Sequence, residues 1–147
     1  YGIYGFSGMK RSGCKLYHIK ELSEAYDSEA WDRIAAIRPK DYTRMAPAIR
    51  HLTELLKKAE TKTRLLIIFS DGKPEDYDGY YGEYAIEDTR KALLEARGLG
   101  ITPFCITIDK QTHAYLEHMF GAGSYLFVNQ LESLPAKMAQ IYRLLTR

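Results

Sequence analysis

Residues 67–93 read IIFSDGKPEDYDGYYGEYAIEDTRKAL, and this stretch decides the fold class of the 147-residue chain. It continues an apolar run typical of strands that are buried on both faces, and the run breaks at Ser70, Asp71 and Gly72. A helical pattern resumes only after an acidic, tyrosine-rich loop. Asp71 therefore stands where a buried strand reaches water, with no His, Lys or second Asp directly beside it. A catalytic acid or nucleophile needs such neighbours, whereas a metal ligand can find its companions on other loops.

The composition fits one globular domain in a reducing compartment. A hydrophobic fraction of 46% is sufficient for a core, and a net charge of +2 gives no support for nucleic-acid or membrane-surface partners, so we expect no nucleic-acid partner. Cys14 and Cys105 are too few for a disulfide framework. The longest apolar run, Leu65–Phe69, is far too short to span a membrane, and no signal-peptide pattern is present. We therefore expect a cytoplasmic protein without a transmembrane segment. Because residue 1 is Tyr and not Met, we also expect a piece of a longer chain.

Hydrophobic patterning predicts strands that alternate with helices through the second half of the chain. Two earlier strands flank a turn that contains Gly and Lys, so they can form a hairpin. Alternating strands and helices indicate parallel strands joined by right-handed crossovers. The predicted fold is a single α/β domain over residues 1–147, with a three-layer, Rossmann-like, mostly parallel sheet and helices on both faces. The predicted strands are Tyr1–Ser7, Lys15–Ile19, Arg64–Ser70, Ile101–Ile108 and Ser124–Val128, and the predicted helices are 28–38, 47–59, Ala85–Leu99, Thr112–Phe120 and Ser133–Leu145.

Several common ligand-binding motifs are missing from the sequence. Neither the G-x-G-x-x-G nor the G-x-x-x-x-G-K-[ST] phosphate-binding loop occurs. Asp76, Asp78 and Gly79 suggest a calcium loop, but its register would require ligands at Pro74 and Ala85 that these residues cannot supply. The four histidines lack the spacing of a metal site on one helix. The chemistry must therefore be sought at the ends of the predicted strands, where open α/β sheets bind ligands.

A phosphoryl-transfer enzyme is the alternative that the strand ends leave open. Asp71 would be the nucleophile, and Lys110, which follows the next strand, would be its charge partner. Such sites need further carboxylates to hold Mg²⁺ against the phosphate. In the Asp-x-Asp pattern of haloacid-dehalogenase phosphatases, however, the second acidic position is Lys73 here. A third reading treats Asp71 simply as a turn residue ahead of Gly72.

The strand that ends Ser-Asp-Gly, together with DYTRMAPAIRHL at residues 41–52, resembles the von Willebrand factor type A (VWA) domains. In that family a metal-ion-dependent adhesion site is built from an Asp-x-Ser-x-Ser segment, a Thr ahead of a helix, and an Asp that ends a buried strand. Thr43 and Asp71 match the second and third of these features. The resemblance implies a non-enzymatic protein-binding domain with Mg²⁺ or another divalent cation at Thr43 and Asp71. Thr43 could also cap the helix that follows it.

Longer strings narrow the resemblance to the C-terminal VWA domain of nitric-oxide reductase activation proteins and their rubisco-activation relatives. These strings are TRMAPAIRHL, SDGKPEDYDGYYGEYAIEDTRKALLEAR, GITPFCITID and YLEHMFG, and the similarity covers nearly the whole chain. The resemblance implies an accessory factor that works with a MoxR-type AAA+ ATPase to activate or mature a metalloenzyme client.

The sequence departs from the family at one point, because it contains no Asp-x-Ser-x-Ser. If Tyr1–Ser7 is the family's second strand, the chain is an N-terminally truncated VWA domain without the usual first strand. Losing a central strand removes two hydrogen-bonded ladders and several buried side chains, which together exceed the stability of a typical domain. We therefore expect the strand to come from other residues or another chain, or the sheet to rearrange, for example as a strand-exchanged homo-oligomer. Without the missing loop, we expect Mg²⁺ binding to be weak or absent.

Four tyrosines follow Asp71 within a short loop: Tyr77, Tyr80, Tyr81 and Tyr84. Tyrosines gathered beside a binding site are typical of protein-recognition surfaces, because they offer a large contact area with few rotatable bonds. The alternative is that some of them pack under the loop and hold it in place. The sequence leaves both readings open.

Overall fold

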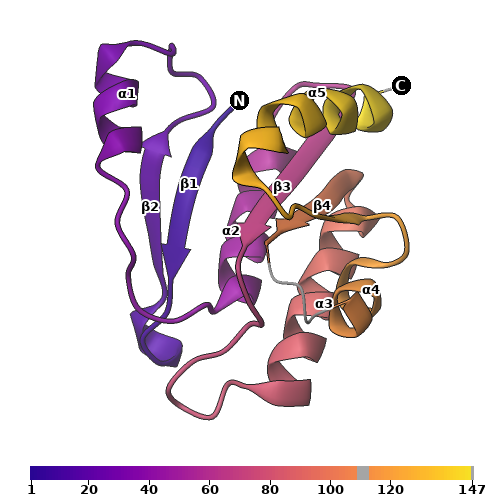
Figure 1. Ribbon diagram of the computed structural model, residues 1–147. Helices are drawn as coiled ribbons and strands as arrows, with labels where there is room; N and C mark the ends of the chain where they lie inside the picture. Colours follow the sequence, from indigo (N-terminus) through magenta and orange to yellow (C-terminus); the bar gives the residue numbers. More distant parts are fainter. Residues whose placement is uncertain (109–112, 147) are drawn as a thin grey trace.

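The computed structural model describes residues 1–108 and 113–146 (Figure 1). The predicted Lys110 and the strand-end residue Asp109 lie outside these described residues. In chain order the elements are β1 (Ile3–Ser7), the 3-10 turn η1 (Arg11–Gly13), β2 (Lys15–Lys20), α1 (Ser28–Ala35), α2 (Met45–Lys57), β3 (Arg64–Ser70), α3 (Gly82–Gly98), β4 (Ile101–Thr107), α4 (His113–Phe120), β5 (Tyr125–Phe127), the 3-10 turn η2 (Leu131–Ser133) and α5 (Leu134–Leu145).

The strands β3, β4 and β5 form a parallel sheet in that order, as the alternation of strands and helices predicts. Ile68 lies opposite Cys105, and Cys105 lies opposite Tyr125, so one register line runs across the three strands. Both long strands are continuous apolar runs because both of their faces are covered. The predicted α/β fold class is confirmed.

Alternate residues of the sheet enter two separate cores, as the period of two along a strand requires. Leu66 and Ile68 pack with α2, α3 and α4 on one face. On the other face, Phe104 and Ile106 pack with Val128 and with Ile141 of α5. Figure 1 shows α5 on the opposite side of the sheet from α2 and α3. The structure therefore has helices on both faces of its parallel sheet.

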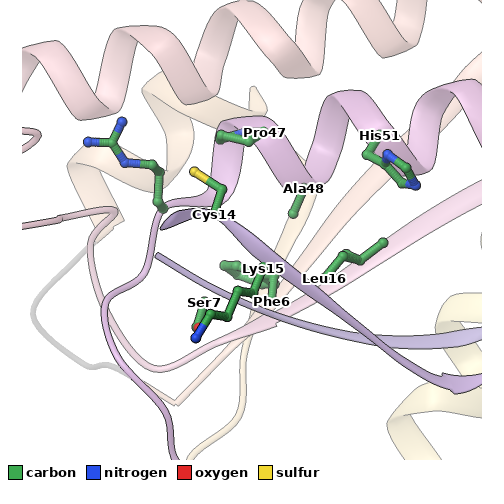
Figure 2. Close-up of a pocket in the computed structure, with 9 residues that line it drawn as sticks. Phe6, Ser7, Cys14, Lys15, Leu16, Pro47, Ala48 and His51 are labelled. Carbon is green, nitrogen blue, oxygen red and sulfur yellow. The ribbon is translucent and has the colours of Figure 1, made fainter. Parts of the chain in front are cut away.

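The hairpin of β1 and β2 forms a second, antiparallel sheet that is not hydrogen-bonded to the first. It is attached through α2, which contacts both β1 and β3, and Phe6 reaches the core under that helix. Figure 2 shows Phe6 and Leu16 of the hairpin lying against the side of α2 that carries Ala48 and His51. The predicted hairpin is confirmed, and the sheet is divided where the family's first strand was expected to be missing.

The facing edges of β1 and β3 carry no strand in the described part of the chain. A cavity of about 690 Å³ extends between them and is lined by Gly5 and Phe6 of β1 and by Phe69 at the end of β3. The Phe69 side chain is 54% exposed, although it lies in the apolar run that predicts a doubly covered strand. An aromatic residue exposed on a strand edge is unusual for a complete sheet.

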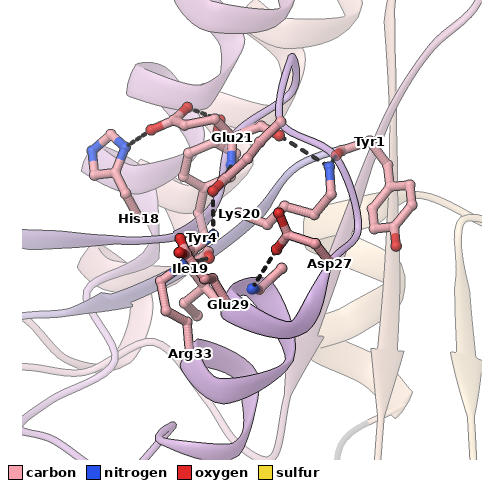
Figure 3. A network of polar contacts seen from close by, with 11 residues as sticks. Tyr1, Tyr4, His18, Ile19, Lys20, Glu21, Asp27, Glu29 and Arg33 are labelled. Carbon is pink, nitrogen blue, oxygen red and sulfur yellow. Dashed lines mark hydrogen bonds and ion pairs between the residues drawn. The ribbon is translucent and has the colours of Figure 1, made fainter.

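Polar contacts hold the segment that leads into α1 on the open end of the hairpin (Figure 3). The Lys20 ammonium group is buried and donates hydrogen bonds to the carbonyls of Tyr1 and Glu21, at 2.7 and 3.1 Å. The Tyr4 hydroxyl donates to Glu21 at 2.7 Å. These contacts provide the buried ammonium group with carbonyl acceptors. Arg33 of α1 donates to the Ile19 carbonyl at 2.5 Å and so joins α1 to the hairpin.

The start of α1 differs from the sequence pattern in two respects. From its residue type Ser28 could cap this helix, but the Asp27 carboxylate accepts the hydrogen bond from the Ala30 amide, and Ser28 is the first helical residue. The spacing of Trp31, Ile34 and Ile37 would place them on one face of a helix over 28–38, yet Trp31 and Ile37 are exposed. The helix ends at Ala35, so Ile37 is outside it and does not share a helix face with Trp31.

The two neighbouring residues Ile68 and Phe69 offer a direct test of the divided sheet. We expect Ile68→Ala to lower the free energy of unfolding by about 3 kcal/mol, because it leaves a cavity in the larger core. Phe69→Ala should cost less than about 1 kcal/mol, because that side chain already contacts water. Urea denaturation of the two variants measures both values. Equal losses would mean that Phe69 is buried in solution and that the gap beside β3 is closed.

Candidate functional site

Asp71 lies at the carboxyl end of β3, directly after its last residue. The Ser70 hydroxyl donates to the Gly72 carbonyl at 3.0 Å, and this local turn carries Asp71 out of the sheet. The carboxylate is exposed and has no hydrogen-bond or ion-pair partner within the described part of the chain. Asp71 borders the cavity beside β1, and it also borders an apolar cavity of about 320 Å³ on the α5 side.

Thr43 lies at the same end of the sheet as Asp71. Its carbonyl accepts a hydrogen bond of 3.1 Å from the Glu75 amide, which places the segment before α2 beside the loop that follows β3. No contact between the Thr43 and Asp71 side chains is present among the described residues, and those residues contain no group of three or more His, Cys, Asp or Glu able to hold a metal ion. One carboxylate and one hydroxyl do not complete the octahedral oxygen shell of Mg²⁺. The described residues alone therefore do not fit a metal ion.

The four predicted tyrosines separate into two structural roles. Tyr77, Tyr81 and Tyr84 are exposed, whereas Tyr80 is only 1% exposed. The Tyr80 hydroxyl donates to Asp88 of α3 at 2.7 Å, and its ring meets the Tyr84 ring edge-on at 5.2 Å between centroids. Tyr80 is therefore buried, which is the packing role that the sequence left open beside the recognition role. It packs under the loop and holds it against α3.

Tyr42 joins the exposed tyrosines from a distant part of the sequence. Its ring centroid lies 6.3 Å from that of Tyr77, and the Lys10 ammonium group lies 5.8 Å from the Tyr77 centroid. Sequence reasoning missed Tyr42 because it is 35 residues from Tyr77 (77 − 42) and carries no local motif. We call the exposed side chains of Tyr42, Tyr77, Tyr81 and Tyr84 the tyrosine surface.

Arg44 is buried under the tyrosine surface and is the second feature that sequence reasoning missed. It is 7% exposed, and its Nε donates to Asp76 at 2.7 Å while its Nη2 pairs with Asp78. Its guanidinium carbon lies 4.2 Å from the centroid of the Tyr80 ring, which is a cation–π contact. The only signal in the sequence was the density of acids after Asp71, which seemed to form a solvated loop.

Asp76 is fully enclosed and collects three hydrogen bonds. Burial alone would raise the pKa of this carboxyl, but the amides of Lys10 and Tyr77 and the Arg44 guanidinium outweigh it and hold the pKa below its ordinary value. The pKa of Arg44 is raised in turn, because the bonds and charges of Asp76 and Asp78 outweigh the effect of its own burial. Both groups therefore stay charged inside the protein.

The two cysteines differ in exposure. Cys105 is buried in the sheet, as its place in the apolar run ITPFCITI indicates, and burial raises its pKa to about 12, so it is an inert core residue. Cys14 is exposed and lines a small cavity between the hairpin and α2 with Ser7, Lys15 and His51 (Figure 2). The buried Ser7 hydroxyl has no hydrogen-bond partner among the described residues.

Comparison with protein families identifies the domain. The family model for the von Willebrand factor type A domain matches residues 9–141. The chain belongs to this family. No solved structure gave a significant match to this VWA domain.

Longer proteins contain similar VWA domains. An uncharacterized protein of Pseudomonas aeruginosa is 44% identical over 147 residues, which is 100% of this chain and 24% of that protein. Protein NorD of Stutzerimonas stutzeri is 44% identical over 130 residues, or 88% of this chain and 21% of that protein. Protein NorD of Brucella abortus is 40% identical over 143 residues, which is 97% of this chain and 23% of that protein. The VWA domain described here spans about a quarter of the length of these relatives.

None of the helices in residues 1–108 and 113–146 has both the length and the apolar character needed to cross a bilayer.

The buried and exposed tyrosines should respond differently to truncation. We expect Tyr80→Ala to lower the free energy of unfolding by about 3 kcal/mol, because it removes a buried ring together with its hydrogen bond to Asp88 and its cation–π contact with Arg44. Tyr81→Ala, at a side chain that is 68% exposed, should change it by less than about 0.5 kcal/mol. Thermal unfolding monitored by circular dichroism measures both. Similar melting temperatures for the two variants would contradict the assigned roles.

Asp76 should give the domain an acid-sensitive part of its stability. Since its folded-state pKa lies below the unfolded value of about 3.9, its contribution is present above that value and is lost as pH falls through the folded-state pKa. We expect Asp76→Asn to cost about 3 kcal/mol near neutral pH, and the difference from wild type to shrink between about pH 5 and pH 2.

The matched control for this experiment is Glu75→Gln, at the exposed neighbouring position. It should change the free energy of unfolding little at any pH. Urea titrations across the pH range give the comparison, and a difference between wild type and Asp76→Asn that stays constant with pH would contradict the ionised, buried Asp76.

Proposed function

We propose that this VWA domain is a non-enzymatic recognition module of an accessory factor that activates a metalloenzyme of the nitric-oxide reductase type, together with a MoxR-type AAA+ ATPase. The similarity to NorD proteins over most of the chain supports the assignment to this class of factor. The observation that carries the recognition role is the tyrosine surface, which is exposed in and next to the loop that follows Asp71 and rests on a buried, charged support.

The tyrosine surface has the physical properties of a protein-binding site. Tyr77, Tyr81 and Tyr84 are each more than half exposed, so their rings are free to contact a partner. Burying such rings contributes a large part of the affinity at protein interfaces, and tyrosine loses little side-chain entropy when it becomes ordered. Tyr42 extends the same surface to the segment that carries Thr43. A partner that covers the tyrosines would therefore also reach the loops of Thr43 and Asp71.

We further propose that Thr43 and Asp71 contribute two ligands to a divalent-cation site of the Mg²⁺ type once other ligands are supplied from outside these 147 residues. A Mg²⁺ ion bound there would accept an oxygen ligand from the partner. Asp71 is suited to such a role because its carboxylate is exposed and unpaired within the described part of the chain. Thr43 is suited because its segment is hydrogen-bonded to the loop that follows Asp71.

The missing metal ligands and the missing strand have one common source in this proposal. The edges of β1 and β3 face the same cavity, and both have backbone groups available for pairing among the described residues. A strand inserted between them would join the two sheets and cover Phe69. We propose that this strand comes from residues outside the 147, with exchange between two copies as the alternative outcome. A chain of the relatives' length has ample residues to supply it.

The proposal is tested with the full-length protein and its purified MoxR-type ATPase. We expect the double variant Tyr77→Ala, Tyr81→Ala to weaken binding at least about tenfold in calorimetry or a pull-down, with an unchanged melting temperature. The matched control is Tyr142→Ala, which removes an exposed tyrosine from α5, away from this surface. Unchanged affinity in the double variant would overturn the assignment of the tyrosine surface.

A labelling experiment on the same full-length protein distinguishes a binding module from a phosphoryl-transfer enzyme. Acetyl phosphate or beryllofluoride should leave Asp71 unmodified if the domain is a binding module. A covalent or tightly bound adduct at Asp71, detected by mass spectrometry or fluorine NMR and lost in Asp71→Asn, would support the enzyme and contradict the proposal.

A further inference from the structure

We infer that Gly8, Arg44 and Asp76 form a latch that positions the tyrosine surface, so that partner binding depends on residues that the partner does not touch. This inference rests on the proposed function for its binding consequence, while the latch itself can be tested without a partner. The three residues come from three separate segments: the end of β1, the residue before α2 and the loop after β3.

Arg44 supplies the directional part of the latch. Its Nε and Nη2 atoms point to two different carboxylates, those of Asp76 and Asp78, and its flat guanidinium group lies over the Tyr80 ring. Only arginine combines a planar fork of donors with stacking on an aromatic ring. A lysine at this position would keep the charge, but it could not hold both carboxylates and the ring in one arrangement. The latch therefore fixes the orientation of the loop as well as its attachment.

Asp76 and Asp78 accept hydrogen bonds from the turn between β1 and β2 and so connect the loop after β3 to that turn. The Lys10 amide donates to Asp76 at 3.0 Å, and the Arg11 amide donates to Asp78 at 2.8 Å. The Tyr77 amide also donates to Asp76, at 2.6 Å. Each carboxylate thus binds Arg44 and a backbone amide of the distant turn. Three segments that are far apart in the sequence meet at one buried charge cluster.

Gly8 permits this close approach because it has no side chain. A Cβ atom at Gly8 would lie 2.7 Å from the Arg44 Cβ and 2.8 Å from the Asp76 Oδ2, which is closer than real contacts allow. The Gly8 backbone also pairs with Tyr42, with N–H···O distances of 2.8 and 2.9 Å in the two directions. Any larger residue at position 8 must therefore push Asp76 or Arg44 away while it remains tied to Tyr42.

The latch residues are directly joined to residues of the tyrosine surface. Tyr42 is bridged to Gly8, Tyr77 follows Asp76 in the chain, and Lys10 both donates to Asp76 and lies over the Tyr77 ring. The 6.3 Å spacing of the Tyr42 and Tyr77 rings is therefore set by the latch, although these rings face solvent. A buried ion pair is costly to desolvate and is a poor source of net stability, but it can specify one conformation among several.

The test is Gly8→Ala in the full-length protein, because it opens the latch without removing a charge or a tyrosine. We expect amide hydrogen exchange at Lys10, Arg11 and Tyr77 to become at least about tenfold faster, while the amides of β3 and β4 keep their protection. Affinity for the MoxR-type ATPase should fall at least about tenfold. The matched control is Gly98→Ala near the end of α3, where a Cβ meets no atom within 4 Å.

A second variant keeps the inference falsifiable if Gly8→Ala does not fold. Arg44→Lys preserves the charge but not the fork, and we expect the same local increase in hydrogen exchange and the same loss of affinity. Unchanged exchange at the three amides in a folded variant would overturn the latch. An increase spread evenly over the whole domain would also overturn it, because the cluster would then be only a stabilising element.

The outcomes also separate this inference from the proposed function. Faster exchange confined to the three amides, with full affinity in both the latch variants and the tyrosine double variant, would show that the latch exists but that the tyrosine surface is not the binding site. Loss of affinity in the tyrosine double variant, with normal affinity and faster exchange in Gly8→Ala, would preserve the surface and overturn the positioning role.

Discussion

A guanidinium group that is almost completely removed from water must be neutralised where it lies, and this requirement organises one whole end of the molecule. Arg44 is charged and buried, so it needs carboxylates within hydrogen-bonding distance. Asp76 and Asp78 meet this need, and they can do so only if the loop after β3 folds back over the segment before α2. The two carboxylates also accept hydrogen bonds from the Lys10 and Arg11 amides in the β1–β2 turn. The arrangement of three loops follows from the solvation of one side chain.

The rest of the fold depends on the burial of apolar surface. This burial is more complete in the parallel sheet than between that sheet and the hairpin. The parallel sheet of β3, β4 and β5 is packed on both faces, with separate cores under α5 and under the helices α2, α3 and α4. The hairpin of β1 and β2 has no such sheet contact and is held mainly through α2. The division explains why an aromatic residue such as Phe69 remains exposed at the end of an otherwise buried strand. It also places Asp71 beside the gap between β1 and β3, where another strand could pair with either edge.

The tyrosine-rich loop illustrates how one local composition can serve two purposes. Tyr80 and Tyr81 are adjacent and chemically identical, yet one is buried against Arg44 and Asp88 and the other faces water. In the proposed function the loop presents aromatic rings to a partner, and the inward ring fixes the backbone from which the other rings project. The supporting and the exposed tyrosines are therefore parts of one design, and both are needed for a well-defined surface.

The sequence by itself determined the fold class, the order of strands and helices, the hairpin, the inert Cys105 and the position of Asp71 at a strand end. These features follow from periodicity, apolar runs and turn residues, which act over a few neighbouring residues. Only the tertiary structure decided that Asp27 and not Ser28 caps α1, that Trp31 is exposed, and that Tyr80 is buried while Tyr42 joins the surface. The pairing of Arg44 with Asp76 also could not be predicted, since 32 residues separate them (76 − 44) and exposed and buried acids look alike in a sequence. Local interactions can be predicted from neighbouring residues in the sequence. The burial of a charge depends instead on which distant segments the folded chain brings around it.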